Sequence, residues 1–191
     1  MALSRIVVTG GPGAGKTSVW RELVTAYGAR VVGVPEVATL LLEHVFPPVQ
    51  NLAERHAVQH AIFQVQRSLE SVADARRSAD QVLLCDRGIP DGAGYWPEGS
   101  PAFFAAMNAD WEAEILRYDA VLFLETAAAG GLSIAAGNAI RTETLEAAVR
   151  VDDQLRSVWS KHPNCVFVPH EVDFAVKLER GSAVLRAWLD G

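Results

Sequence analysis

Short, nearly continuous apolar runs recur along the chain and alternate with segments of helical periodicity. Runs of this kind that are rich in β-branched residues predict strands buried on both faces. The predicted strands cover residues 4–9, 30–34, 81–86, 119–125 and 165–169. Because these strands alternate with helices, the pattern predicts a five-stranded parallel sheet with helices on both faces, which is an α/β fold.

The intervening segments predict the helices that cover this sheet. One begins near Lys16, four more span about 35–46, 51–78, 101–117 and 143–161, and a last one runs to Leu189. In the longest helix, apolar residues recur at helical spacing and predict a buried stripe: Val58, Ala61, Ile62, Val65, Leu69, Val72 and Ala73. Thr142 is the expected N-cap of the helix at 143–161.

Composition narrows the class of protein. The 191 residues are 50% hydrophobic and 21% charged, as in a folded protein, and we expect one domain over residues 1–191. A net charge of −6 argues against a broad nucleic-acid or anionic-membrane surface. Cys85 and Cys165 lie within predicted strands and are expected to be buried hydrophobes. Charges and prolines interrupt the longest apolar region, and no signal peptide follows Met1, so we expect no membrane span and a cytoplasmic location.

The glycine-rich stretch "GGPGAGKT" between the first strand and helix predicts a phosphate site. It fits the Walker A pattern G-x-x-x-x-G-K-[ST], in which glycines let backbone N–H groups approach a phosphate. Lys16 would reach the outer phosphates, and the Thr17 hydroxyl would ligate Mg²⁺. The alternative is a glycine-rich turn without a ligand. We expect nucleotide contacts from nine residues: Gly10, Gly11, Pro12, Gly13, Ala14, Gly15, Lys16, Thr17 and Ser18.

A second motif, "CDRGIPDGAGYW", follows the third strand. Asp86 ends that strand and would hold Mg²⁺ at the carboxyl edge of the sheet, while Arg87 would grip a phosphate or a substrate anion. The alternative is an Asp–Arg pair that only caps the next turn. Asp91 contacts substrate or lies in the first turn of a helix. Tyr95 and Trp96 stack on a substrate ring or pack in the core.

These motifs together resemble a known family. The segments "VVTGGPGAGKTS", "VPE", "DRGIPDGAGYW" and "RTETLEAAVRVDDQLRSVW…VFVP" are similar to the small P-loop NTPases described as AAA-type predicted ATPases. They also resemble the kinase domain of bacterial nicotinamide-riboside kinases, over nearly the whole chain. The resemblance implies a kinase-type sheet of order 2-3-1-4-5, with the Asp86 strand beside the P-loop strand. Some members of this family are similar to GTP- or lipid-binding proteins.

Three further segments are candidates for chemistry. The chain resembles nucleoside kinases around Glu36, where a carboxylate accepts the proton of the attacking hydroxyl. The alternative is a first-turn glutamate that the helix dipole stabilises. Residues 127–141, rich in alanine and glycine, are a candidate lid; the alternative, which their low polarity favours, is a packed loop. Arg141 at its end would clamp the transferring phosphoryl group, or would be a solvated arginine. After the fifth strand, His170 or Val172 would pack on the nucleotide base.

Two classes of function remain. The first is an ATP- and Mg²⁺-dependent kinase that phosphorylates a small, hydroxyl-bearing, nucleoside-like substrate. The catalytic residues would be Lys16, Glu36, Asp86, Arg87 and Arg141. The second is an ATP- or GTP-dependent regulatory or lipid-binding protein, or an ATPase. A signalling GTPase should carry N-K-x-D, which is absent from the sequence. An AAA+ motor should end its strand in Asp-Glu and carry a helical lid domain, whereas this strand ends in Asp-Arg.

Overall fold

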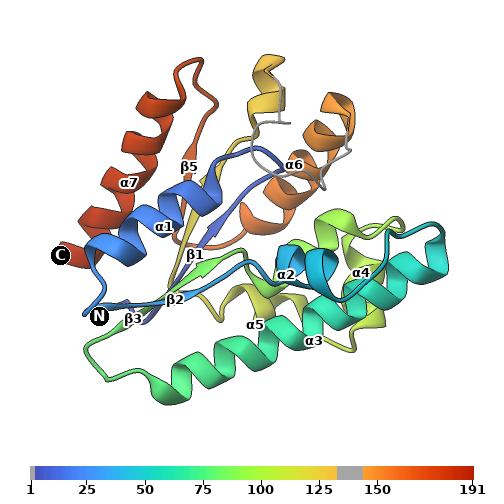
Figure 1. Cartoon of the computed structure of the whole chain (residues 1–191), viewed down its shortest axis with the longest axis horizontal. Helices are drawn as coiled ribbons and strands as arrows, with labels where there is room; N and C mark the ends of the chain where they lie inside the picture. Colours follow the sequence, from blue (N-terminus) through green and yellow to red (C-terminus); the bar gives the residue numbers. More distant parts are fainter. Residues whose placement is uncertain (1–2, 133–143) are drawn as a thin grey trace.

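Five parallel strands form one sheet in the order β2-β3-β1-β4-β5 (Figure 1). The structure is a computed structural model and describes residues 3–132 and 144–191. The strands are β1 (Arg5–Thr9), β2 (Val31–Val34), β3 (Val82–Asp86), β4 (Ala120–Leu124) and β5 (Cys165–Val168). The expected order is confirmed, because β3 pairs in parallel with both β1 and β2, and Val8 lies opposite Asp86.

Helical segments connect the strands. They are α1 (Lys16–Ala26), α2 (Val37–His44), α3 (Leu52–Arg76), η1 (Ile89–Tyr95), α4 (Ser100–Ala106), α5 (Trp111–Ile115), η2 (Ala127–Gly130), α6 (Leu145–Trp159) and α7 (Phe174–Asp190). The segments η1 and η2 are 3₁₀ helices. In the described part of the chain, no helix has the length and apolar character needed to cross a bilayer.

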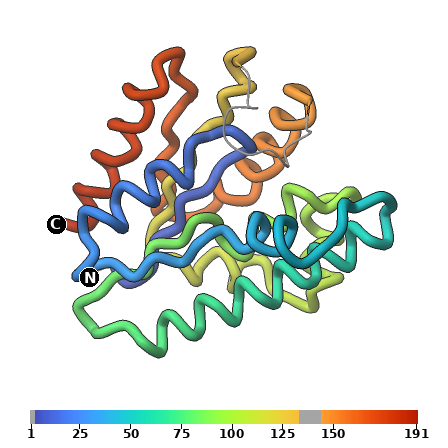
Figure 2. Tube along the Cα trace, in the orientation of Figure 1, coloured from blue at the N-terminus to red at the C-terminus, as the bar shows by residue number. Residues whose placement is uncertain are grey.

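The two faces of the sheet are covered by different helices. Alternate strand residues point to opposite faces, so Ile6 and Val8 pack in one core cluster and Val7 in the other. Helices α1 and α7 lie side by side over the first face (Figures 1 and 2). Helices α3, α4, α5 and α6, together with η1, cover the second face. Cys85 is buried in this second cluster and Cys165 packs against it, both as free thiols.

The buried stripe of α3 is only partly as predicted. Val58 is buried, but Val65 and Val72 are 41% and 46% exposed. The positions that face inward include Gln66 and Glu70, both of which are buried. Polar side chains can occupy these positions because each finds partners beneath η1, whereas the prediction placed only apolar residues inside.

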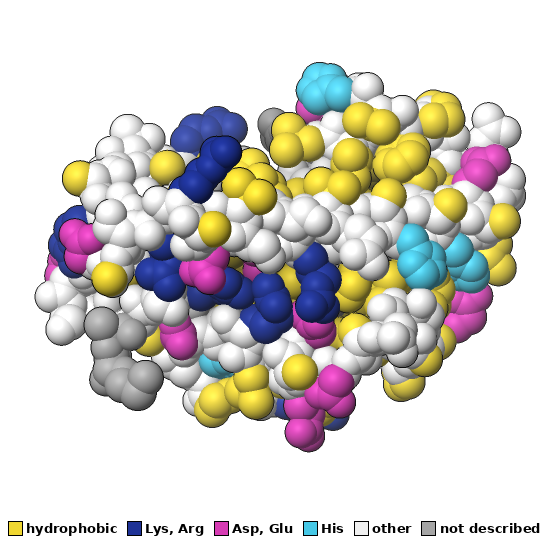
Figure 3. Space-filling view, turned by 90° about the horizontal axis from the view of Figure 1, so that it is seen from below, with side chains coloured by type: hydrophobic (Ala, Val, Ile, Leu, Met, Phe, Trp, Pro, Cys, Tyr) yellow, Lys and Arg dark blue, Asp and Glu magenta, His cyan; other side chains and the backbone are white. Residues whose placement is uncertain are grey.

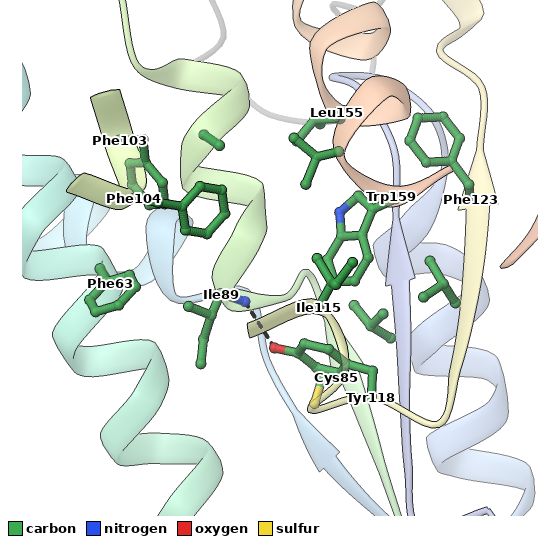
Figure 4. Packing of buried hydrophobic residues seen from close by; sticks show 14 of the residues in the cluster. Phe63, Cys85, Ile89, Phe103, Phe104, Ile115, Tyr118, Phe123, Leu155 and Trp159 are labelled. Atoms are coloured by element: carbon green, nitrogen blue, oxygen red, sulfur yellow. Dashed lines mark hydrogen bonds between the residues drawn. The ribbon is translucent and has the colours of Figure 1, made fainter. Parts of the chain in front are cut away.

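A hydrogen-bonded network connects α3 to the start of η1. Glu70 accepts from Gln66 Nε2 at 2.9 Å and from the Tyr118 hydroxyl at 2.8 Å. The Tyr118 oxygen in turn accepts from the Ile89 amide at 2.9 Å, the dashed line in Figure 4. Burial raises the pKa of Glu70. Arg5 and Arg117 each lie 3.6 Å from its other oxygen. The network thus provides partners for the polar groups under η1.

Basic and acidic side chains alternate on the outside of this layer. Figure 3 views the molecule from below, the side on which α3 lies in Figure 1, and shows a band of lysine and arginine side chains with carboxylates among them. Arg67 pairs with Glu114 between α3 and α5. Arg5 lies 3.4 Å from Asp74. Carboxylates thus pair with arginine side chains in this layer.

The predicted helix at 101–117 is two helices. Asn108 adopts a positive φ of 49°, which ends α4, and the Asp110 side chain then accepts from the Ala113 amide at 2.8 Å to begin α5. An asparagine tolerates this backbone conformation better than most residues. Apolar spacing alone cannot reveal such a break, because the spacing continues across it.

Helix α6 begins later than predicted. Its N-cap is Thr144, whose hydroxyl accepts from the Ala147 amide at 3.2 Å. The expected cap, Thr142, lies outside the described residues. Both threonines precede an apolar periodic segment, so sequence spacing alone did not distinguish them.

Candidate active site

A glycine loop joins β1 to α1 at the carboxyl edge of the sheet. Gly10, Gly13 and Gly15 have φ values of 131°, 71° and 91°, which L-residues with side chains rarely adopt. A Cβ at Gly10 would lie 1.9 Å from the Leu124 carbonyl oxygen. Gly15 is the N-cap of α1, and no side chain caps this helix. The backbone amides and the positive end of the helix dipole thus form a cradle suited to an anion.

Helix α6 holds this cradle from behind. The Oδ1 atom of Asp152 accepts from the Gly11 amide at 2.7 Å and from the Thr126 amide at 3.0 Å. The Thr126 hydroxyl donates to the Pro12 carbonyl. Within the loop, Lys16 Nζ donates to the Gly11 carbonyl at 2.8 Å. Side chains from two other segments therefore fix the first half of the loop.

Asp86 lies beside the cradle with part of its hydrogen-bonding capacity unused. The residue is 1% exposed, and its Oδ1 atom has no hydrogen-bond partner in the part of the chain that the structure describes. Burial and the nearby Glu36 carboxylate raise the pKa of Asp86 to about 6, and a hydrogen bond from Thr17 opposes this shift. A buried, unpartnered carboxylate oxygen next to a hydroxyl is a suitable donor set for a cation.

These donors fit Mg²⁺ bound together with a nucleotide. The described residues contain no group of three or more His, Cys, Asp or Glu side chains that could hold a metal by themselves. Mg²⁺ commonly uses one or two protein oxygens together with phosphate and water oxygens. Thr17 and Asp86 offer this number of oxygens, and the Asp86 oxygen is unpartnered in the described chain.

Arg87 connects the cradle to the neighbouring elements. Its Nε donates to Glu36, and its Nη1 donates to the Gly10 carbonyl at 3.4 Å and to Asp91 Oδ2 at 3.2 Å. Its Nη2 donates to the Tyr95 hydroxyl at 2.9 Å. The guanidinium is 8% exposed and lies between two carboxylates. Arg87 is therefore a buried junction whose charge is balanced by Glu36 and Asp91.

Glu36 precedes α2 but does not act as a cap. It is the N-cap residue by position, yet its side chain makes no capping hydrogen bond. Instead it accepts from Arg87 and, at 2.8 Å, from the Thr39 hydroxyl. Burial alone would raise the pKa of Glu36, but the charges of Arg87 and Lys16 outweigh it and lower the pKa to about 2. At neutral pH the group is a fixed anion and a weak base.

A cavity of about 300 Å³ opens beside these residues, between α2, α3 and η1. Polar side chains at its wall include Glu36, Arg87 and Tyr95. Apolar side chains complete the lining: Val37, Leu42, Ile62, Phe63, Ile89 and Phe103. An apolar cavity with a few polar groups at one end is the usual form of a small-molecule site. Trp96 does not line it; this residue is 5% exposed and packs in the core.

Most of the residues predicted for the site lie together. The charge of Lys16 acts to lower the pKa of both Glu36 and Asp86, which indicates that the three side chains lie close together. The Asp86 carboxylate accepts a hydrogen bond from Thr17. Ser18 lies exposed in the first turn of α1. Arg141 and most of the candidate lid lie outside the described residues; η2, within 127–132, is the described part of that segment.

The residues suggested for base contact lie in the β5–α7 connection. The His170 amide donates to Glu125 Oε2 at 2.7 Å, and Val172 is 83% exposed. Phe174, at the start of α7, is half exposed, and a Cβ at Gly15 would approach its ring at 2.7 Å. This apolar ring adjoins the cradle, although the sequence analysis did not select it.

Sequence reasoning missed three side chains that bond segments around the site. Asp152 and Trp159 lie on α6, where Asp152 accepts from the Gly11 amide of the loop and Trp159 donates to Asp91. Lys177 lies on α7 and donates to the Glu125 carbonyl. Burial lowers the pKa of Lys177 to about 8. The available signal was a charged residue at a stripe position: Asp152 lies four residues after buried Ala148 and three before buried Leu155. A charge at such a position needs a buried partner.

Comparison with known proteins identifies a similar fold and the family of the chain. The structure is similar to a solved structure described as "Structure of deoxyadenosine kinase from M.mycoides with bound dATP", with a TM-score of 0.66. The sequence identity is 13%, and the match covers 96% of this chain and 99% of that chain. At this identity the likeness concerns the fold. No curated protein matches the sequence. A family model described as "AAA domain" matches residues 5–175. The chain therefore belongs to this AAA-domain family of P-loop NTPases.

Proposed function

We propose that the protein is a cytoplasmic, ATP- and Mg²⁺-dependent kinase that phosphorylates a hydroxyl group on a small, nucleoside-like molecule. One observation carries the proposal: the Arg87 guanidinium contacts the first carbonyl of the phosphate cradle and also lines the adjacent cavity. A cradle alone would suit any nucleotide-binding protein. A cavity that shares a side chain with the cradle gives a second molecule access to the outer phosphate.

The cradle would bind the nucleotide. Backbone amides of residues 13–16 would surround the phosphates, and the Lys16 side chain would exchange its contact with the Gly11 carbonyl for the outer phosphates. Thr17 and Asp86 would hold Mg²⁺ with the nucleotide, which supplies positive charge next to the phosphates. The fold similarity to a kinase and the family match support this assignment.

Glu36 would orient the acceptor hydroxyl. It lies in the cavity wall, and Arg87 and Thr39 fix its two oxygens. With a pKa of about 2, Glu36 is ionised and accepts a hydrogen bond, but it removes a proton only weakly. Phosphoryl transfer depends mainly on positioning and charge stabilisation, so a weak base in a fixed position is sufficient. We also propose, from the sequence alone, that Arg141 adds charge at the transferring phosphoryl group.

The test is ADP release from ATP and Mg²⁺ with a panel of nucleosides. Release that depends on one added nucleoside supports the kinase. Release without any acceptor indicates an ATPase, and nucleotide binding without release indicates a regulatory binder; either result contradicts the proposal. Calorimetry with Mg²⁺ and ATP or GTP gives the base preference. Lys16→Ala should abolish nucleotide uptake, and Lys161→Ala, an exposed lysine after α6, is the matched control.

A further inference from the structure

Asp91 is a buried carboxylate whose oxygens are occupied by donors from three elements. The Thr9 hydroxyl, at the end of β1, lies 2.8 Å from both oxygens. The Trp159 indole Nε1 donates to Oδ1 at 2.7 Å from the last residue of α6. Arg87 Nη1 donates to Oδ2 at 3.2 Å. With these partners in place, the carboxylate is held against Arg87 at the wall of the cavity, to which Asp91 also belongs.

The Trp159 ring is held tightly against the same motif. A Cβ at Gly88, the residue after Arg87, would lie 2.9 Å from the indole. In Figure 4 the ring lies between η1 and the strands, above Tyr118. A Cβ at Gly94, at the other end of η1, would lie 2.7 Å from Leu155 on α6. Helix α6 therefore touches the backbone of the Arg87 motif directly and also binds it through Asp91.

Arg87 itself requires support. Its φ is 70°, a left-handed conformation that a non-glycine residue adopts at a cost in free energy. Such a conformation persists where surrounding contacts over-determine it. Glu36 binds one side of the guanidinium and Asp91 binds the other. Because the guanidinium binds the Glu36 carboxylate, the position of the guanidinium sets the position of that carboxylate. Glu36 in turn belongs to the cavity wall.

We propose that Asp91 is a positioning residue for the Arg87–Glu36 pair, and that Thr9 and Trp159 hold it in place. The inference rests on the proposed kinase function. Asp91 would not touch the transferred phosphate or the acceptor; it would fix the guanidinium between the cradle and the cavity. Trp159 and Asp152 both belong to α6, so this helix supports the cradle through Asp152 and Arg87 through Asp91. Thr9, the other donor to Asp91, immediately precedes Gly10 of the cradle.

Two substitutions loosen Asp91 without touching the cavity. Thr9→Val removes the hydroxyl donor with little change of shape, and Trp159→Phe removes the indole donor while keeping an aromatic ring. The matched control is Trp20→Phe. Trp20 Nε1 also donates at 2.7 Å, but to the Leu84 carbonyl on the other face of the sheet. The Trp20→Phe variant therefore loses an indole hydrogen bond of the same length as that of Trp159, but on the other face of the sheet from Asp91.

The first measurement is the Arg87 Nε–H resonance in a ¹H–¹⁵N spectrum, assigned by its loss in Arg87→Lys. We expect it to be shifted or broadened in Thr9→Val and Trp159→Phe and unchanged in Trp20→Phe. The second is steady-state kinetics with the nucleoside that supports ADP release. We expect kcat to fall by about tenfold in both variants and KM for ATP to stay within about twofold, because misplacement affects the transfer step.

The outcomes separate the two proposals. If no nucleoside supports ADP release, the kinase proposal fails, and the resonance alone decides whether Asp91 positions Arg87. An unchanged resonance in both variants overturns the positioning role. So does a kcat loss of equal size in Trp20→Phe, since that result would reflect general destabilisation. If Trp159→Phe fails to fold, Thr9→Val carries the test.

Discussion

The two faces of the sheet bury different chemistry. Beneath α1 and α7 the cluster is mainly aliphatic, with Ile6, Val8, Leu84 and Leu122 all fully buried. Across the sheet the cluster contains most of the large aromatic side chains and borders the buried charges of Glu70, Arg87 and Asp91. Aliphatic packing stabilises a fold without fixing the position of a charge. Hydrogen-bonded charges fix directions. We therefore expect damage to the first face to reduce stability, and damage to the second to reduce activity.

The largest effect is expected at the site on the polar face. Glu36→Gln keeps the size of the side chain but removes its charge, which weakens its pairing with Arg87 and leaves the acceptor hydroxyl only a neutral, less firmly placed amide oxygen. We expect kcat for nucleoside-dependent ADP release to fall by about 10²-fold through misplacement of the acceptor. The control is Glu43→Gln, an exposed glutamate on α2, the helix that Glu36 precedes; it should retain full turnover. Full turnover in Glu36→Gln would remove Glu36 from the proposed mechanism.

The next effect tests the aliphatic face. Leu122 on β4 is 0% exposed, and Leu122→Ala should lower the free energy of unfolding by about 2–5 kcal/mol through lost burial and the cavity left behind. Urea unfolding at 25 °C measures this loss. The turnover of the remaining folded protein should be unchanged. The control is Val65→Ala at an exposed position of α3, for which we expect a change within about 0.5 kcal/mol. A large loss of turnover in folded Leu122→Ala would contradict the division between the faces.

A third effect depends on pH. The pKa of Asp86 is raised from 3.8 to about 6, so the folded protein binds this proton more tightly than the unfolded chain. This linkage favours folding below about pH 4 and is lost as the pH rises through 6. Without nucleotide and Mg²⁺, Asp86→Asn should therefore increase the free energy of unfolding at pH 8 by up to about 3 kcal/mol.

The increase should vanish below about pH 4, and unfolding in urea at several pH values measures it. Asp153→Asn, an exposed carboxylate on α6, should change little across the range. The same Asp86→Asn protein should lose the effect of Mg²⁺ on ATP binding. A variant that is less stable than the wild type at pH 8 would show that Asp86 has partners that favour its ionised form.

The smallest effect concerns the helix that supports both the cradle and Arg87. Thr144→Ala removes the N-cap of α6 and should lower stability by about 1 kcal/mol. Thr25→Ala, on the exposed side of α1, removes a hydroxyl bonded to its own helix and should be neutral or slightly stabilising. Thermal unfolding compares the two. Equal effects would show that Thr144 does not cap α6 in solution.

Contiguous features of the molecule could be predicted, and features assembled from distant segments could not. The cradle was predictable because its glycines and lysine lie within residues 10–16, directly between a predicted strand and a predicted helix. The sheet order was implied by the resemblance and is confirmed. The pairing of Arg87 with Glu36 depended on the register of β2 against β3, which no local pattern contains.

Buried polar residues account for the errors in helix orientation. Apolar spacing predicts an apolar interior, so the prediction turned α3 toward Val65 and Val72, which are partly exposed. The side chains actually inside include Gln66 and Glu70, whose cost of burial is offset by their mutual hydrogen bond and by the Tyr118 hydroxyl, in the turn after α5. Asp152 was missed for the same reason. A polar residue within an apolar stripe thus indicates a buried partner.

The hydrogen bonds that Asp152 and Trp159 of α6 make limit what a fragment of the chain can do. A fragment ending after η1 would contain the cradle, Glu36, Asp86 and Arg87, which are the described residues assigned to phosphate transfer. It would still lack Asp152 and Trp159, which arrive more than fifty residues later. A second fragment that carries α6 would therefore have to re-form the contacts of Asp152 and Trp159 before phosphate transfer could resume.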